Sequence, residues 1–153
     1  MSLALIYRIK NKGYLIFGSV KTETGISVGT DPYIRIAETE INANTIASAI
    51  KIALDQDEAK RVPHPTDWNK DDKEFLRKSG LKSLKELHKE SSMLCNVKKE
   101  NSSLVFIPLI HAENLNQGYV NVSKDRDVNV IIPHSASDLE IFNALELAFS
   151  RVK

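Results

Sequence analysis

The chain has 153 residues, 42% of them hydrophobic and 27% charged, with a formal net charge of +1 at pH 7. These values are typical of one globular domain with its own core, and the interleaved charges argue against a phosphate-binding surface. No apolar run approaches the roughly 20 residues that cross a membrane, and no secretory signal opens the chain. With Cys95 as the single cysteine, we expect a cytoplasmic protein without an internal disulfide.

The first half of the chain, residues 1–58, combines strands with one helix. Residues 13–20, GYLIFGSV, form its most apolar predicted strand, and residues 25–38 are expected to form two short strands around the turn residues Gly29 to Pro32. An amphipathic helix follows, with Asn42 at its N-cap. Its apolar face consists of Ile46, Ile50, Ala53 and Leu54.

Residues 59–98 form a polar linker and a helical insert. Pro63 and Pro65 mark the linker as a surface connection. The first predicted helix, residues 71–79, has acids in its first turn and ends at Gly80. A second helix is expected to begin at Ser83, with Glu86 completing a capping box. Its partial apolar face consists of Leu84, Leu87 and Leu94.

The second half, residues 99–153, repeats the order of the first. The apolar strand SLVFIPLI spans residues 103–110, and two strands are expected around a turn from Ser123 to Asp127. The closing helix has a capping box formed by Ser137 and Glu140. Its apolar stripe consists of Ile141, Phe142, Leu145, Ala148, Phe149 and Val152.

The two long helices match at an offset of 95 residues, with Asn42 in the place of Ser137 and Ile50 in the place of Leu145. Each half therefore has the predicted order β-β-β-α, and one such unit leaves an apolar face open to water. We predict a single α+β domain in two layers, with a mainly antiparallel sheet of about six strands and both helices on one side. Two unrelated amphipathic helices in an α+β protein are the alternative. Ile52 and Leu147 lie off the apolar stripes, so we expect the insert or a partner to cover them.

The residues that most often carry chemistry form no recognisable site. The four histidines have no metal-binding spacing, and no glycine pattern matches a nucleotide-binding loop. His134, Ser135 and Asp138 lie at a helix entry, where such residues cap backbone groups rather than form a triad. Cys95 lies among apolar residues and is expected to be buried. We therefore expect no enzyme, metal, cofactor or small-molecule substrate.

Residues 80–109, then GYVNV, then PHSASDLEIFNALELAFSR resemble CdiI, the immunity proteins of contact-dependent growth inhibition systems. The shared features are a Gly-x-Lys-Ser helix entry, a polar hairpin leading into an apolar strand, and the closing Ser-x-x-(Asp/Glu)-x-x-x-x-Ala-Leu-x-x-Ala helix. The resemblance implies a cytoplasmic antidote that binds the C-terminal toxin domain of a cognate CdiA, commonly a nuclease, and performs no catalysis. It transfers no catalytic or contact residue.

Physical chemistry places the predicted partner contacts in the insert. Trp68 is the only tryptophan, and this residue type is the most enriched at binding hot spots. Asp71, Asp72 and Glu74 follow it and would meet the basic groups of a nuclease. Burial of Trp68 beneath the insert, and pairing of a toxin strand with a sheet edge, are alternatives. The competing function is a nucleic-acid-binding or adaptor module that uses the lysine-rich insert.

Overall fold

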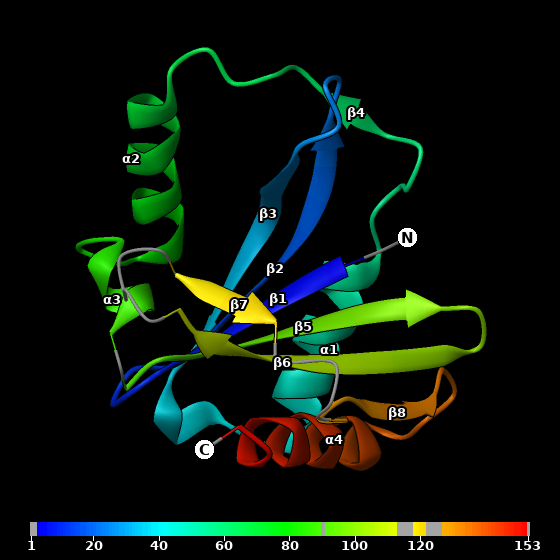
Figure 1. Cartoon of the computed structure of the whole chain (residues 1–153). Coiled ribbons are helices and arrows are strands. Elements are labelled where there is room, and N and C mark those ends of the chain that lie inside the picture. Colours follow the sequence, from blue (N-terminus) through cyan, green and yellow to red (C-terminus); the bar gives the residue numbers. More distant parts are fainter. Residues whose placement is uncertain (1–2, 90, 113–117, 122–126, 153) are drawn as a thin grey trace.

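The computed structural model describes residues 3–89, 91–112, 118–121 and 127–152, and it has the predicted α+β architecture (Figure 1). One sheet of eight strands, rather than about six, runs through the molecule. Its strands are β1 (Leu3–Ile9), β2 (Gly13–Thr22), β3 (Ser27–Ile36), β4 (Arg61–Val62), β5 (Met93–Glu100), β6 (Ser103–His111), β7 (Tyr119–Asn121) and β8 (Val130–Pro133). The helices are η1 (Glu38–Glu40), α1 (Ala43–Leu54), α2 (Trp68–Ser79), α3 (Lys85–His88) and α4 (Asp138–Ser150).

The main path of the sheet has the strand order β3-β2-β1-β5-β6-β7, with β8 also paired to β6. All these pairs are antiparallel, and only the two-residue strand β4 runs parallel to its partner β2. β1 and β5 join the two halves at the middle of the sheet. Residues 99–153 have the predicted order, with β6, β7 and β8 before α4, whereas β5 begins inside the predicted insert. The first half has the order β1-β2-β3-α1, but β1 was not predicted and β3 replaces two predicted strands.

Helices α1 and α4 pack side by side against one face of the sheet, as predicted (Figure 1). Both begin with the expected caps, since Asn42 and Ser137 each accept a hydrogen bond from the backbone three residues on. Side chains from both helices and from the sheet form the main core. Its largest fully buried members are Tyr14, Phe106, Phe149, Ile6, Ile16, Ile46, Ile50, Ile141 and Leu145.

The insert covers the opposite face of the sheet, mainly over the first half. There α2 and α3 lie on a smaller core formed by Ile9, Leu15, Phe17, Leu81 and Leu87. Helix α3 also contacts β7, where the Tyr119 hydroxyl donates to the carbonyl oxygen of Leu87 at 2.8 Å. Because α1 and α4 lie on the other face, the insert does not cover them. Ile52 and Leu147 remain 48% and 45% exposed, so the expectation that the insert buries them is wrong.

The predicted turn from Gly29 to Pro32 is also wrong, because β3 is one continuous strand of 10 residues. Its register with β2 shifts between Ile16 and Gly18, so a bulge accommodates the residues around Pro32. β3 is the outermost strand and pairs only with β2. Proline is tolerated there, since its missing N–H interrupts no second ladder.

The second insert helix is much shorter than predicted. α3 has four residues, and its N-cap is Leu84, with no side-chain cap. The Glu86 carboxylate contacts Lys12 Nζ and the Lys82 backbone N–H instead of completing a capping box. Leu94 belongs to β5, where it faces Tyr7 of β1.

The structure does not test the predicted second-half turn, and it bears on the membrane only through the helices. Of the turn from Ser123 to Asp127, residues 123–126 lie outside the described residues. Within the described ranges, no helix combines the length and the apolar character that a membrane span requires.

Candidate partner-binding groove

A groove of about 700 Å³ lies between α2 and β3. Figure 1 shows α2 standing beside β3, with the linker at one end and α3 at the other. The insert therefore forms one wall, and the edge of the sheet forms the other. The lining consists of Tyr7, Phe17, residues 27–29, Tyr33, residues 63–68, Lys70, Asp71, Asp72, Glu74, Phe75, Lys78, Leu84, Leu87 and His88.

Four aromatic rings, here called the aromatic floor, pack at the base of the groove. They are Tyr7, Phe17, Tyr33 and Phe75, from β1, β2, β3 and α2. The Phe17 ring centroid lies 4.9 Å from that of Tyr33 and 5.6 Å from that of Phe75. Tyr33 and Phe75 meet edge to face at 5.4 Å. These contacts dock α2 on the sheet and give the groove an apolar base.

Gly29 keeps the floor open above these rings. A Cβ atom at this position would lie 2.9 Å from the Phe17 ring and 3.0 Å from the Tyr33 hydroxyl oxygen. Any side chain here would therefore have to displace the floor.

The wall formed by α2 carries an acidic rim, defined as Asp67, Asp71, Asp72 and Glu74. Asp67 caps the helix by accepting a hydrogen bond from the Lys70 N–H at 3.1 Å. Glu74 pairs with Arg77 at 2.9 Å, and this hydrogen bond and charge lower the pKa of the Glu74 carboxyl. Asp71 and Asp72 form no ion pair with any residue that the structure describes.

The charges along the groove do not balance. The four carboxylates of the acidic rim face two lysines, Lys70 and Lys78, and Lys78 is already paired with Asp31. The groove is therefore locally negative, although the chain as a whole has a net charge of +1. A cationic group would enter this site favourably.

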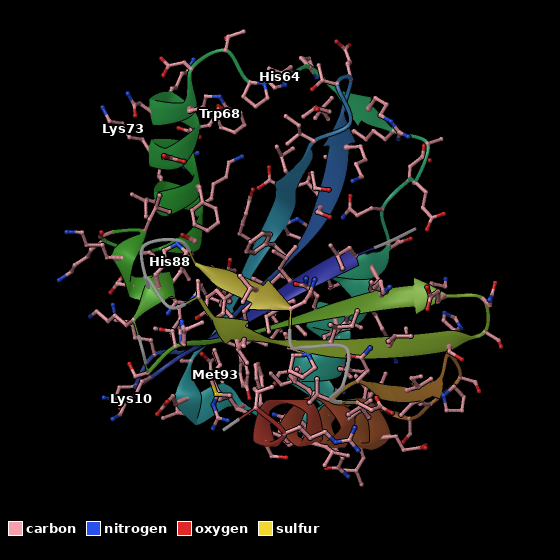
Figure 2. The ribbon with its side chains drawn as sticks, viewed as in Figure 1. Lys10, His64, Trp68, Lys73, His88 and Met93 are labelled. Carbon is pink, nitrogen blue, oxygen red and sulfur yellow. The ribbon has the colours of Figure 1, made fainter. Side chains whose placement is uncertain are left out.

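Trp68 is the first residue of α2, and its side chain is 51% exposed. Figure 2 shows it next to His64 of the linker, and the two rings meet edge to face at 5.9 Å. His64 Nδ1 in turn lies 2.8 Å from the Thr24 hydroxyl, which ties the linker to the β2–β3 hairpin. The alternative that Trp68 is buried beneath the insert is therefore wrong, and the indole is presented at the end of the groove.

The opposite end of α2 is fixed by Arg35 of β3. Its Nη1 donates a 3.0 Å hydrogen bond to the carbonyl oxygen of Ser79, in the last turn of α2. Gly80 then ends the helix in the left-handed conformation at φ 73°, as predicted. Both walls of the groove are therefore held in place before any partner arrives.

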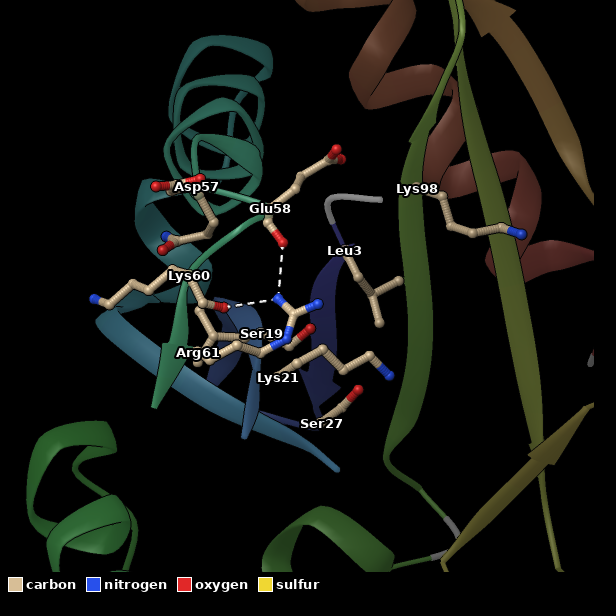
Figure 3. Close-up of a pocket in the computed structure, with 11 residues that line it drawn as sticks. Leu3, Ser19, Lys21, Ser27, Asp57, Glu58, Lys60, Arg61 and Lys98 are labelled. Carbon is tan, nitrogen blue, oxygen red and sulfur yellow. Dashed lines mark hydrogen bonds between the residues drawn. The ribbon is translucent and has the colours of Figure 1, made fainter. Parts of the chain in front are cut away.

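A second, smaller cavity of about 280 Å³ lies between β2, β4, β5 and the linker (Figure 3). Lys21, Lys60, Arg61 and Lys98 outnumber Asp57 and Glu58 in its lining. The Arg61 guanidinium is already engaged, since Nη1 donates to the carbonyl oxygens of Glu58 and Lys60 at 3.0 Å each. Lys60 and Lys98 point away from each other in Figure 3, so the cations do not converge on one point.

The residues at the start of α4 that resemble a triad make other contacts, and the metal-binding side chains do not cluster within the described residues. Asp138 pairs with Lys51 at 2.8 Å, and Ser137 rather than Ser135 caps α4. No group of three His, Cys, Asp or Glu side chains among the described residues is arranged to hold a metal. Cys95 is fully buried, as predicted, and burial raises the pKa of its thiol.

The structure brings all four residues of the predicted contact site, Trp68, Asp71, Asp72 and Glu74, to the same groove. Sequence reasoning did not find the aromatic floor opposite them. The floor combines rings from three strands and one helix, and no local sequence pattern links these positions.

The fold and the groove define a class of protein: an α+β domain with one large, mainly antiparallel sheet and an open groove beside its outer strand. The chain belongs to the CDI immunity protein family, whose model matches residues 5–152. No protein of curated function matches the sequence.

Two solved structures share the fold at low sequence identity. A Neisseria meningitidis protein of unknown function is 16% identical with a TM-score of 0.70, and the match covers 100% of this chain and 96% of that one. A CdiA-CT/CdiI toxin and immunity complex from Yersinia pseudotuberculosis matches at 16% identity with a TM-score of 0.64, covering 99% and 97%.

Proposed function

We propose that this protein neutralises the C-terminal toxin domain of a cognate CdiA by binding it in the cytoplasm. Membership of the CDI immunity protein family over nearly the whole chain carries this proposal. The similarity in fold to a toxin and immunity complex from Yersinia pseudotuberculosis is consistent with it. In this account the protein acts by occupying the toxin and performs no catalysis itself.

We further propose that the toxin is a nuclease and that Trp68, Asp71, Asp72 and Glu74 take part in the contact. A nuclease carries basic groups that bind phosphates, and these would be attracted to the acidic rim. Trp68 offers a half-exposed aromatic surface beside that rim. Blocking the phosphate-binding groups would exclude the substrate of the toxin.

Co-expression tests this function. The C-terminal toxin domain of the cognate CdiA should arrest growth when expressed alone, and the present protein should restore growth. The two proteins should also co-purify as a complex. Arrested growth together with no co-purification would contradict the proposed function. Binding of the purified chain to nucleic acid at low salt would instead support the adaptor reading of the insert.

A further inference from the structure

We infer that the groove between α2 and β3 receives one segment of the toxin, in which a cationic side chain lies next to an apolar one. This inference rests on the proposed function and deepens it by naming the chemistry of the partner. The cationic group binds at the acidic rim beside Trp68. The apolar side chain packs above the aromatic floor.

The electrostatic part of the inference follows from Asp71 and Asp72. Both side chains are exposed, and neither forms an ion pair with a described residue, although Lys70 lines the same groove. Glu74 is already paired with Arg77 and Asp67 caps the helix, so these two carboxylates contribute less. An incoming Lys or Arg thus finds two unpaired carboxylates on adjacent residues at the N-terminal end of α2.

The aromatic part follows from Trp68 and the floor. A cation within about 6 Å of an indole face gains attraction from the ring quadrupole, and Trp is the most favourable aromatic residue for this contact. Tyr33 and Phe75 are only partly buried, so an apolar side chain above them removes further apolar surface from water. One segment with both kinds of side chain uses both parts of the groove.

A second copy of this chain is a poorer occupant. In a symmetric dimer the same patch lies on both subunits, so two grooves facing each other would bring one acidic rim against the other. Like charges at such a contact are unfavourable. The charge of the groove therefore favours a basic partner of a different kind.

The test measures the association and dissociation rates of the purified toxin domain on the immobilised protein of residues 1–153. Removing rim charges is expected to act on association, whereas truncating a buried aromatic anchor is expected to act on dissociation. Asp71→Asn/Asp72→Asn should slow association about 5-fold at low salt and flatten its salt dependence. Trp68→Ala should speed dissociation by roughly 30-fold.

Matched controls distinguish the groove from general effects. Asp55→Asn/Asp57→Asn removes two exposed carboxylates that lie outside the groove, and Leu139→Ala truncates a side chain that is 59% exposed on α4. Both controls should bind like the wild type. Thermal unfolding followed by circular dichroism should show that all four variants are folded.

The outcomes separate this inference from the proposed function. If the wild type binds the toxin and the groove variants bind it equally well, the groove assignment is overturned and the proposed function stands. Equal losses in the matched controls would overturn it too. If the folded wild type does not bind the toxin, the proposed function fails, and the inference fails with it. A wild-type dimer that dissociates on Trp68→Ala would assign the groove to self-association instead.

Discussion

Lys78 Nζ lies 2.9 Å from Asp31 Oδ2, so an ion pair joins α2 to β3, the two walls of the groove. The Asp31 side chain is 64% exposed and that of Lys78 is 35% exposed. Solvent therefore screens most of the attraction, and such pairs are worth about 0.2–1 kcal/mol. Lys78 also lies 5.9 Å from the centre of the Tyr33 ring. The main consequence of this lysine is to reduce the negative charge of the groove.

Lys78→Ala should consequently lower the free energy of unfolding by less than about 1 kcal/mol while speeding toxin association. Removal of the cation frees the Asp31 carboxylate and makes the groove more negative. Urea denaturation and association rates at two salt concentrations measure these effects. Asp31→Asn/Lys78→Ala provides the control, because it should return association toward the wild-type rate. Slower association for Lys78→Ala alone would contradict the account.

Phe75 docks α2 on the sheet through Phe17 and Tyr33. Phe75→Ala should lower the free energy of unfolding by about 2–3 kcal/mol, less than for a fully buried ring, because Phe75 is only partly buried. Urea denaturation measures the loss, and hydrogen exchange should locate it in α2. Leu139→Ala, at an exposed position, should change stability by no more than about 0.5 kcal/mol. Equal stabilities for the two variants would rule out this role for Phe75.

Ser137 accepts a hydrogen bond from the Glu140 N–H at 3.2 Å, and the Glu140 side chain accepts one from the Ser137 N–H at 3.1 Å. Ser137→Ala should cost about 1 kcal/mol of stability because it leaves a backbone donor at the start of α4 without its partner. Ser135→Ala is the matched control and should be neutral, both in stability and in toxin neutralisation. A loss of neutralisation with Ser135→Ala would restore the residues resembling a triad as candidates.

All four tyrosines should lose their hydroxyl protons at a higher pH than free tyrosine does. Burial raises the pKa of Tyr7 and that of Tyr33 to about 12, with the Asp31 charge adding to the effect at Tyr33. Burial also raises the pKa values of Tyr14 and Tyr119. In the folded protein, absorbance at 295 nm should therefore stay nearly flat through pH 10, whereas in urea the tyrosines should ionise near their ordinary value of about 10.

The raised tyrosine pKa values also make the free energy of unfolding depend on pH. Because the folded-state pKa values are raised, the unfolded chain loses its tyrosine protons first as the pH increases. The free energy of unfolding should be unaffected by the tyrosines below pH 10 and should fall between about pH 10 and 12. Tyr7→Phe should reduce the fall. Normal titration near pH 10 in a protein that circular dichroism shows to be folded would contradict the burial of these rings.

The three long helices, α1, α2 and α4, could be predicted from sequence because the signals at their ends are local, whereas the local signal for α3 was misleading. These signals act over a few neighbouring residues: Asn42 caps the start of α1, Ser137 and Glu140 form the capping box of α4, and Gly80 ends α2. The errors lie where tertiary position overrides such signals. Gly29 and Pro32 favour a turn in isolation, yet both lie inside β3 because an outer strand with a bulge accepts them.

The candidate groove also has one part that the sequence could predict and one part that it could not. Trp68, Asp71, Asp72 and Glu74 are close in sequence and share one helix, so their composition and spacing were enough to single them out. The floor opposite them joins Tyr7, Phe17 and Tyr33, whose proximity depends on strand pairing and on the docking of α2. Only the folded structure shows that both sets line one surface.

Titration of toxin activity with the purified protein tests the central claim most directly. The account predicts that nuclease activity of the cognate CdiA toxin domain falls linearly and ends at one equivalent of the wild-type protein. Trp68→Ala combined with Asp71→Asn and Asp72→Asn should require a large excess, while Asp55→Asn/Asp57→Asn should match the wild type. Toxin activity that persists at a large excess of the folded wild-type protein would contradict the account.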